Sequence, residues 1–587
     1  MTAFNYPEKF DVIVIGAGHA GCEAALAAAR LGAKTLLLTQ DLDTVAQMSC
    51  NPSIGGVGKG QLVRELDALG GEMAKVTDLA MLSCHMLNTS RGAAVRSPRA
   101  QCDKKIYQAA MKHALELEPN LRLVQDEAAA ILTKGSKAAG VSTLRGTRYT
   151  SKTVVITAGT FMRGVIHIGL DNFPGGRYNH PPSQELSKGL IGLGFKLGRL
   201  KTGTPMRLHA RSIDFSKCEA QAPDSPPEPM SHFTAKITAR LLPCWITRTS
   251  AATAEVIKAG LHLSPLYSGK IKSTGPRYCP SIEDKIVKFP HHGAHHLFLE
   301  PEGFGTEEYY ANGLSTSLPE ETQHEIVRSV PGLENAEIMR PAYAIEYDYS
   351  DPSQLDYTLE TRPLPGLFLA GQLNGTTGYE EAAAQGLVAG VNAARKALGG
   401  EPLVLRRDEA YIGVMIDDLV SKGVDEPYRI FTSRAEYRLM LRQDNADLRL
   451  AAKGFELGLL APSLKANFEA YRAAFEDSLA GRKPKALPPG PWTAERARAT
   501  AAIEKSYSSY IERNRRDAEN LKKFEDLRIP EDFNYTALKA LPNEARHKLE
   551  KHRPLTLAQA GRIPGVTPAD VQLLWVLLEQ RRGGKTK

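Results

Sequence analysis

The chain has 587 residues, of which 42% are hydrophobic, and it carries a formal net charge of +8. Its length predicts three or four folded units at about 150 residues each. The N-terminus has no signal-peptide pattern and no run approaches the roughly 18 apolar residues of a membrane span, so we expect a soluble, cytoplasmic protein without membrane contact. Seven scattered cysteines, an odd number, argue against a disulfide framework and for reduced thiols.

Residues 10–39 have the order strand, glycine loop, helix, strand that opens a Rossmann unit. Residues 10–15 (FDVIVI) form a continuous apolar run, as expected for a strand buried on both faces of a parallel sheet. The loop 16–21 (GAGHAG) follows directly, then an Ala-rich helix at 22–31 and a second apolar strand at 34–39. Such a unit binds dinucleotide phosphates at the N-terminus of its helix.

Three glycines in this loop have the spacing GxGxxG, and each has an expected role. Gly16 makes the tight turn, Gly18 leaves room for the pyrophosphate, and Gly21 lets the helix pack on the strand. The acid that normally binds the ribose is missing, because Thr39 ends the second strand and Asp41 follows two places on. The sequence therefore predicts where the phosphates bind and leaves ribose recognition open.

A second glycine-rich loop, residues 51–60 (NPSIGGVGKG), follows Cys50. It is not a Walker A phosphate loop, because Ser53 takes the place of the first glycine and Gly60 that of the final Ser or Thr. We expect it to face a flavin. A disulfide-reductase role for Cys50 is disfavoured, since Gly55 stands where a second thiol is needed.

Two later strand patterns extend the parallel sheet across long insertions. They are residues 153–157 (TVVIT) and 367–370 (LFLA), and each precedes a glycine turn. A small-residue helix begins after the second, at Gly378, and its N-terminus is expected to meet the isoalloxazine ring and stabilise negative charge on reduced flavin. This helix end favours FAD over NAD at the glycine loop, although a tightly packed core helix has the same pattern.

Proline clusters mark two breaks. Residues 221–229 (QAPDSPPEP) predict an exposed loop within the largest insertion, 201–363, and residues 483–491 (KPKALPPGP) predict a linker before a helical tail. From residue 481 to the C-terminus there are 22 Lys or Arg against 13 Asp or Glu. This tail either contacts a polyanion such as a nucleic acid or is an ordinary solvated helical surface, and charge alone does not separate the two.

Cys279 lies in a turn, residues 275–285 (GPRYCPSIEDK). Arg277 and Lys285 lie near enough in sequence to lower the pKa of the thiol and make its thiolate a nucleophile. A buried, inert cysteine is the commoner fate, so both roles stay open for this residue.

A metal site is disfavoured at a group of histidines with i, i+4 spacing. Pro290 and Gly293 argue against a helix there, so we predict an exposed loop and no metal site. The histidines are His291, His292, His295 and His296.

With these elements in place, the sequence resembles the family of tRNA uridine 5-carboxymethylaminomethyl modification enzymes called MnmG or GidA. The resemblance covers almost the whole chain and is specific, because many long, unusual motifs occur in order. The motifs are residues 16–21 (GAGHAG), 48–60 (MSCNPSIGGVGKG), 169–177 (GLDNFPGGR), 199–205 (RLKTGTP), 275–285 (GPRYCPSIEDK), 298–303 (FLEPEG), 371–386 (GQLNGTTGYEEAAAQG), 431–450 (FTSRAEYRLMLRQDNADLRL) and 554–571 (PLTLAQAGRIPGVTPADV).

The resemblance implies a homodimer that binds FAD and NADH, acts on tRNA and works with a GTPase partner, MnmE. Together they are expected to place an aminomethyl-type group on carbon 5 of the wobble uridine, with the one-carbon unit from methylenetetrahydrofolate and the amine from glycine or ammonium. The implied FAD contacts are Gly16, Ala17, Gly18, His19, Ala20, Gly21, Ala128, Ser183 and Gln372. The implied NAD residues are Gly275, Pro276, Arg277, Tyr278, Cys279, Pro280, Ser281, Ile282, Glu283, Asp284, Lys285, Ile286, Val287, Lys288 and Phe289.

This chemistry needs a nucleophile, because carbon 5 of uracil is itself a poor one. A thiolate that adds at carbon 6 creates an enolate, which attacks an electrophilic methylene carried by folate or flavin. We assign the role to Cys50 or Cys279, since both match cysteines of the family motifs. Reduced flavin, regenerated by NADH, is expected to handle the methylene unit or a reduction step.

The expected fold is therefore α/β, with a Rossmann-like FAD-binding domain of the glutathione-reductase type, a large inserted α/β domain and a C-terminal all-helical domain. The FAD-binding domain is expected at residues 1–200 and 364–400, and the inserted NAD-binding domain at 201–363. Residues 401–587 are expected to form the helical domain, whose basic tail resembles the region that the family uses for tRNA and its GTPase partner.

Two other functions stay open. A folate- and FAD-dependent tRNA uridine methyltransferase shares the N-terminal motifs but lacks a long basic C-terminal domain, so the residues after Arg434 argue against it. The alternative from another class is a scaffold that holds flavin only structurally and docks RNA through its basic tail. Anaerobic reduction of the flavin by NADH would separate an enzyme from such a scaffold.

Overall fold

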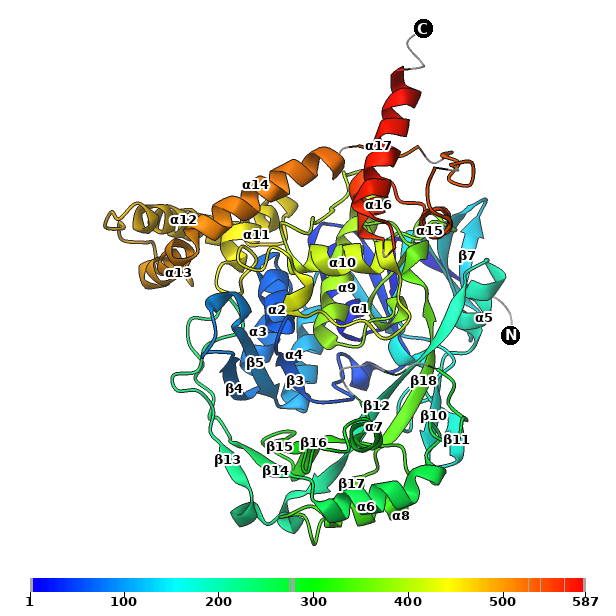
Figure 1. The fold of residues 1–587 in the computed structure, drawn as a ribbon, viewed down its shortest axis with the longest axis vertical. Helices are drawn as coiled ribbons and strands as arrows, with labels where there is room; N and C mark the ends of the chain where they lie inside the picture. The colour runs from blue at the N-terminus through cyan, green and yellow to red at the C-terminus, as the bar shows by residue number, and fades with distance from the viewer. Residues whose placement is uncertain are drawn as a thin grey trace.

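The computed structural model describes residues 4–273, 275, 280–525, 527–530, 532–538, 540–563 and 565–583. A mostly parallel sheet lies beside a larger antiparallel sheet, and the helices of the last third of the chain lie at the end away from that second sheet (Figure 1). Within the described ranges no helix combines the length and apolar character needed to cross a bilayer.

The first sheet has seven strands and contains all four predicted parallel strands. Strands β6, β2, β1, β9 and β19 run parallel in that order, and β8 and β7 extend the sheet antiparallel from β9. Val12, Ile13 and Val14 are completely buried, as the continuous apolar run predicts. The bounds are β1 Phe4–Ile15, β2 Thr35–Thr39, β6 Leu121–Gln125, β7 Ala128–Lys134, β8 Lys137–Thr143, β9 Thr147–Ile156 and β19 Leu367–Leu369.

Two helices with small residues pack closely together on this sheet. They are α1 (His19–Arg30), which begins three residues before the predicted start, and α9 (Tyr379–Leu398). A Cβ atom on Gly386 would lie 2.1 Å from the carbonyl oxygen of Ala20, and one on Gly390 would lie 2.2 Å from that of Ala24. The glycines and alanines are therefore required for the approach of the two backbones.

The second sheet has nine strands and is antiparallel throughout. Its order is β11, β10, β18, β12, β16, β15, β14, β13, with β17 also paired to β12. Three helices share its core, through residues such as Ile257, Ile286 and Ile326. The bounds are β10 Val165–Ile168, β11 Asp171–Pro174, β12 Leu197–His209, β13 Glu219–Gln221, β14 Cys244–Arg248, β15 His296–Pro301, β16 Glu308–Ser315, β17 Ile338–Arg340, β18 Tyr343–Ser350, α6 Ala251–Gly260, α7 Ile282–Lys288 and α8 Glu320–Arg328.

A small third sheet and four helices complete the N-terminal half. The sheet has the antiparallel order β3, β5, β4, and it holds the chain just after Cys50 against residues 97–102. The bounds are β3 Ser53–Gly55, β4 Met81–Leu87, β5 Ser97–Cys102, α2 Lys59–Ala68, α3 Met73–Leu79, α4 Lys104–Glu116 and α5 Glu185–Gly192.

Only helices and loops follow α9 in the described chain, which confirms the predicted all-helical C-terminal region. The last of them form a bundle with its own core, built around residues such as Phe533, Leu549 and Leu574. The bounds are α10 Tyr411–Lys422, α11 Ala446–Leu457, α12 Lys465–Leu479, α13 Ala494–Ser506, α14 Ser508–Glu525, α15 Asn543–His552, α16 Leu557–Arg562 and α17 Pro568–Gly583.

The proline-rich break at 483–491 is a loop but does not separate two units, so the predicted linker is wrong. It joins α12 to α13, and these helices pack on each other through the buried Trp492. The ring of Trp492 lies 5.2 Å from that of Phe468, and the Asn467 side chain donates to Pro488 O and accepts from Trp492 N. Helix α12 ends at Leu479, before the prolines, and Gly481 takes a left-handed conformation there with φ +74°. The long-range contacts then hold α13 against α12.

Candidate cofactor and catalytic site

A cavity of about 430 Å³ lies at the carboxyl ends of the parallel strands of the first sheet. Its walls include Thr39 at the end of β2, Asp126 after β6 and Thr157 after β9. Strand β12 of the second sheet closes the cavity with residues 202–204. Parallel sheets bind ligands at this edge, and the volume is within the range of cofactor pockets.

The cavity collects eight of the nine residues implied for FAD. The exception is Gly21, which lies behind the wall. Four segments far apart in sequence therefore meet at one site. The lining residues are Gly16, Ala17, Gly18, His19, Ala20, Ala128, Ser183 and Gln372.

The three glycines of the first loop have different surroundings. Gly16 has φ +97°, a conformation that favours glycine, in the turn between β1 and α1. A Cβ on Gly18 would meet nothing within 4 Å, so the backbone is open to the cavity at the N-terminus of α1. A Cβ on Gly21 would lie 1.7 Å from the carbonyl oxygen of Gly16, which fixes the close packing of helix on turn.

Carboxylates that the sequence pattern missed line the cavity beside Thr39. The Thr39 hydroxyl donates to the carbonyl of Asp41 at 3.2 Å, so it is engaged in its own turn. Asp126 and Glu127 follow β6, which pairs with β2, and both contribute to the wall. Asp126 forms an ion pair with Arg145 at 3.2 Å, and burial raises the pKa of Glu127. The sequence feature that could have identified Asp126 and Glu127 is the short strand β6 directly before them, because ligands bind where parallel strands end.

The N-terminus of α9 faces the cavity with Gly378, Tyr379 and Ala382, as expected for the second helix end. The glycine-rich loop 51–60 does not line this cavity, which corrects the expectation that it faces the ligand. It packs behind the helix, because Gly55 N–H donates to Glu380 at 2.7 Å.

Cys50 lines the cavity, and its sulfur lies 2.9 Å from the Tyr310 hydroxyl. The Cys50 N–H donates to the hydroxyl of Tyr379 at 2.7 Å, and the sulfur is 3.9 Å from the carbonyl of Gly203. The Arg207 guanidinium donates to the carbonyl of Cys50 at 3.4 Å. Strands β12 and β16 of the second sheet and the N-terminus of α9 therefore surround this thiol.

The described part of the predicted NAD segment consists of Gly275 and residues 280–289, and the latter comprise α7 and its flanks. Its Ile282 is buried in the second core, and none of these ten residues lines the cavity. Gly275 comes closer, because a Cβ there would lie 3.3 Å from Lys201, the neighbour of the lining residue Thr202. The remainder of the segment lies outside the described residues and comprises Pro276, Arg277, Tyr278 and Cys279.

Two further lining groups have unusual environments. Arg177 stacks over the Phe161 ring, with its guanidinium carbon 5.6 Å from the ring centre, and burial lowers its pKa to about 10. His19 stacks on Tyr379 with ring centres 4.4 Å apart, and burial lowers its pKa to about 4, so it is neutral at pH 7. Sequence reasoning placed His19 in the motif but gave no role to Arg177.

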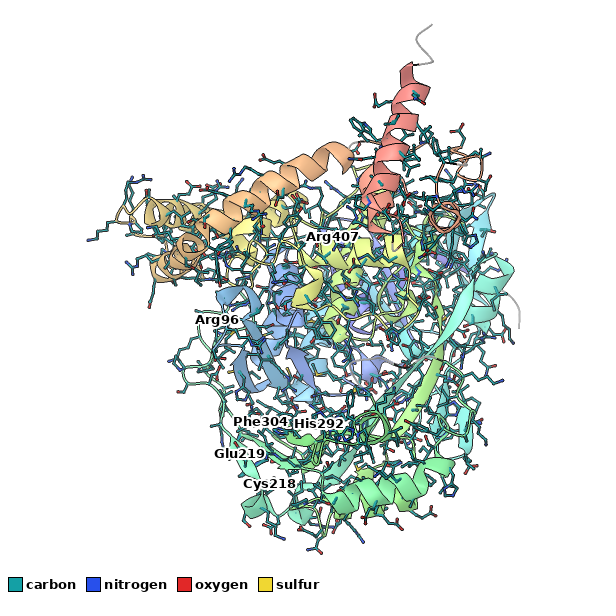
Figure 2. The ribbon with its side chains drawn as sticks, viewed as in Figure 1. Arg96, Cys218, Glu219, His292, Phe304 and Arg407 are labelled. Carbon is teal, nitrogen blue, oxygen red and sulfur yellow. The ribbon has the colours of Figure 1, made fainter. Side chains whose placement is uncertain are left out.

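The histidine-rich segment is a loop that ends where β15 begins, as predicted. His292 lies beside the second sheet (Figure 2). In the described chain no three His, Cys, Asp or Glu side chains are grouped as metal ligands. The proline-rich residues 221–229 also form a mostly exposed loop apart from their first residue, in β13.

Comparison with known proteins identifies the family that has this fold and cavity. Residues 11–401 match the family model for glucose inhibited division protein A (GidA), and residues 517–587 match that for the tRNA modifying enzyme MnmG/GidA C-terminal helical bundle. The chain belongs to the GidA family. A GidA relative from Geotalea uraniireducens, named tRNA uridine 5-carboxymethylaminomethyl modification enzyme MnmG, is 51% identical over 98% of this chain and 99% of its own. The relative of the same name from Geobacter sulfurreducens is 50% identical, with 99% of each chain covered.

A solved structure of the family has the same fold over nearly the full chain. GidA of Aquifex aeolicus, in its form II crystal, superposes with a TM-score of 0.90 at 49% identity and covers 97% of this chain and 98% of its own. The form I crystal gives a TM-score of 0.89 at 51% identity. The GidA fold therefore extends from the first sheet to the C-terminal helices.

Proposed function

We propose that the chain is an FAD-dependent enzyme that modifies carbon 5 of the wobble uridine in tRNA, the activity for which its GidA relatives are named. The observation that carries the proposal is the single cavity in which a dinucleotide-binding loop, a second helix N-terminus and the Cys50 thiol meet. A phosphate site alone fits many enzymes, whereas a thiol beside it fits addition chemistry on a pyrimidine.

The residues around the cavity fit FAD. The open backbone at Gly18 and the N-terminus of α1 suit a pyrophosphate. Glu127 lines the cavity next to the end of β2, and its carboxylate would accept a hydrogen bond from a ribose hydroxyl. Ala128, Ser183 and Gln372 complete the proposed contacts. When bound, FAD supplies two-electron redox chemistry to the site.

The chain's own part in the reaction is to supply and hold a nucleophile. The Cys50 thiolate adds to carbon 6 of the uracil, a sulfur–carbon bond forms, and the electrons of the 5,6 double bond move to the carbonyl oxygen at carbon 4. Carbon 5 of the resulting enolate attacks the methylene that methylenetetrahydrofolate provides. Loss of the carbon 5 proton and of tetrahydrofolate leaves an exocyclic methylene, to which the amine of glycine or ammonium adds. Departure of the Cys50 thiolate from carbon 6 then restores the 5,6 double bond. Cys279 remains the second candidate nucleophile.

The finer parts of the proposal concern partners. They are NADH as reductant, bound through Gly275 to Phe289, glycine or ammonium as amine donor, MnmE as GTPase partner, a homodimer and a cytoplasmic location. Gly275, the first residue of the proposed NAD segment, lies close to Lys201 beside the cavity. This proximity supports a binding site for NADH on the side of the cavity that the second sheet forms.

Binding of tRNA is proposed for the basic helices at the C-terminal end. Arg513, Arg515 and Arg516 are exposed on α14. Replacing all three by Gln should weaken tRNA binding. The slope of log affinity against log salt should decrease in magnitude by roughly two to three, because each phosphate contact that is lost means that about one counterion fewer is released on binding. Gln at Lys134, Lys137 and Arg148, in and beside the β7–β8 hairpin, is the matched control. Equal slopes for both triple variants, measured by filter binding, would exclude α14 from the tRNA surface.

The central experiment is nucleoside analysis of tRNA from cells that lack the gene, complemented with the parent chain or with Cys50→Ser. We expect the modified wobble uridine to disappear without the gene and to return only with the parent. Appearance of the same nucleoside in the deletion strain contradicts the proposed function. A missing 5-methyluridine in its place identifies the methyltransferase alternative.

Purified protein tests the flavin directly. We expect FAD to co-purify and its absorbance near 450 nm to bleach when NADH is added anaerobically. Flavin that stays oxidised while tRNA still binds identifies the scaffold alternative.

A further inference from the structure

Cys50 and Tyr310 form a pair that joins the two sheets. Their sulfur and hydroxyl oxygen lie 2.9 Å apart, although 260 residues separate them in sequence. Cys50 follows the loop after β2 of the first sheet, whereas Tyr310 lies on β16 of the second. The contact therefore forms only when the second sheet is packed against the domain that contains the first sheet.

Tyr310 is buried, with 2% of its surface exposed, and a cation lies over its ring. The guanidinium carbon of Arg207 is 4.9 Å from the ring centre. Arg207 is itself fixed, because it donates to Glu302 at 3.0 Å and to the carbonyl of Ser49 at 2.8 Å. The positive charge thus lies beside both the phenol and the backbone that carries the thiol.

The other groups around Cys50 are donors or acceptors without negative charge. Tyr379 accepts the Cys50 N–H, and Tyr343 lines the same cavity from β18. In the described chain the titratable or charged groups that face Cys50 are Tyr310, Tyr379, Tyr343 and Arg207. No described carboxylate is hydrogen-bonded to the sulfur, whose other described neighbour is the carbonyl oxygen of Gly203, an acceptor, at 3.9 Å. The Tyr310 hydroxyl is therefore the described group in contact with the sulfur that can donate a hydrogen bond to a thiolate.

We propose that Tyr310 stabilises Cys50 as a thiolate by donating its hydroxyl hydrogen to the sulfur, with Arg207 as the positioning residue that holds the phenol and adds a positive field. The thiol proton leaves to water before the uridine binds, and the sulfur keeps the electron pair that later forms the bond to carbon 6. Hydrogen bonds to an ionised acceptor are stronger than those to a neutral one, so the contact favours the thiolate over the thiol. The assignment rests on the proposed function only in naming uridine as the target of this sulfur.

The consequence is that thiolate formation depends on the second sheet. A displacement of β16 would remove the donor from Cys50 without changing the cofactor loop. Activation of the nucleophile is thereby tied to closure of the cavity by the second sheet, which belongs to the proposed NAD-binding domain.

The test measures the pH dependence of Cys50 alkylation in the FAD-loaded full chain. Iodoacetamide incorporation is followed by mass spectrometry of the Cys50 peptide, in the parent and in Tyr310→Phe. We expect the midpoint to rise by about one pH unit in Tyr310→Phe. Alkylation at pH 7 should slow about three- to fourfold, because the tenfold loss of thiolate is partly offset by its higher nucleophilicity. Tyr309→Phe is the matched control, since Tyr309 lies on the same strand but its ring packs against that of Phe215, with the ring centres 5.3 Å apart.

Absorbance near 240 nm, taken as the difference from Cys50→Ser, reports the thiolate itself if bound FAD shields the sulfur from the reagent. Should Tyr310→Phe fail to fold, 3,5-difluorotyrosine at position 310 keeps the shape and acidifies the phenol, and the midpoint should then fall. An unchanged midpoint in either variant overturns the proposal. These measurements need neither tRNA nor folate, so a shifted midpoint in a protein that does not modify tRNA would sink the proposed function and leave the thiolate pair standing.

Discussion

At the scale of single residues, Arg177 is a partly buried cation in the wall of the cavity, and no acidic side chain of the described residues forms an ion pair with it. In the described chain its Nε atom has no hydrogen-bond partner, while the burial that lowers its pKa to about 10 disfavours its charge. A bound anion would offset that cost. We therefore expect Arg177, which lines the same cavity as Gly18, to contact the FAD pyrophosphate.

Arg177→Met should raise the Kd for FAD about tenfold or more, because a hydrogen bond to a charged group contributes about 1.5–3 kcal/mol. Quenching of FAD fluorescence on titration of the apoprotein measures this. Arg148→Met, at an exposed position of β9, should bind as the parent does. An Arg177→Met affinity equal to that of the control would show that the anion lies elsewhere.

His19 gives a pH dependence that can be isolated. Its pKa in the folded chain is about 4, below the ordinary 6.5, because burial penalises the charged ring. Between pH 6.5 and 4 the unfolded chain binds this proton and the folded chain does not, so stability falls with decreasing pH by up to about 1.4 kcal/mol per unit.

His19→Asn should remove that part of the slope. Urea unfolding at pH 7, 6 and 5 compares it with the parent, and exposed His113→Asn serves as the control. Parallel pH dependences for the parent and His19→Asn would mean that His19 takes up its proton in the folded chain as readily as in the unfolded one.

At the scale of elements, the first βαβ unit was predictable because its signals are local. The apolar run of β1, the glycine loop and the alanines of α1 lie within thirty or so residues, and each property appears in the sequence at the position where it acts. The helix at Gly378 was predictable for the same reason.

The features that the sequence did not reveal depend on contacts between segments that are far apart in the chain. Cys50 and Tyr310 meet only through the packing of two sheets, and Glu127 reaches the cavity only because β6 pairs with β2. The loop 51–60 was expected to face the ligand because a run of glycines indicates that another group lies close to the backbone, without indicating which group it is. At Gly55 the close neighbour is the backbone of Pro98, where a Cβ would lie 2.2 Å from the carbonyl oxygen.

The start of α1 allows the two roles of glycine to be separated. Gly21→Ala should destabilise the fold by about 3 kcal/mol or more, because its Cβ would overlap the carbonyl of Gly16 and the packing cannot yield. Gly18→Ala should fold as the parent does and lose FAD affinity, since its Cβ would occupy the open space of the cavity. Thermal melts and FAD titration of the two apoproteins measure both effects. Equal melting temperatures would disprove the packing role of Gly21.

At the scale of the whole molecule, the C-terminal bundle is attached through an ion pair. Arg562 of α16 lies 2.8 Å from a carboxylate oxygen of Asp417 in α10, and Tyr357 donates to the same carboxylate at 3.1 Å. Arg407, which Figure 2 labels near the junction, binds Asp417 at 3.0 Å and keeps it paired. A cavity of about 800 Å³ separates the bundle from the body around these residues.

Arg562→Met should loosen the bundle without unfolding the body. We expect the amides of α16 to exchange about tenfold faster, because one charged contact is lost while Asp417 keeps Arg407. Hydrogen-exchange mass spectrometry measures this, with Lys548→Met as the control, since that ion pair with Glu544 lies within the bundle. Identical exchange in the two variants would mean that the ion pair does not hold the junction.

The close packing of α1 on α9 has a consequence for biosynthesis. The two helices touch through glycines at 386 and 390, and β19 joins the sheet only at residue 367. A ribosome that adds about 5–20 residues per second needs roughly 20–80 s to reach the end of α9. During that interval the glycine loop has been made, but the wall that β12, β18 and the N-terminus of α9 supply is not yet complete. The nascent chain therefore cannot capture its flavin as it emerges, and the supply of free cofactor matters only once two thirds of the protein has been synthesised.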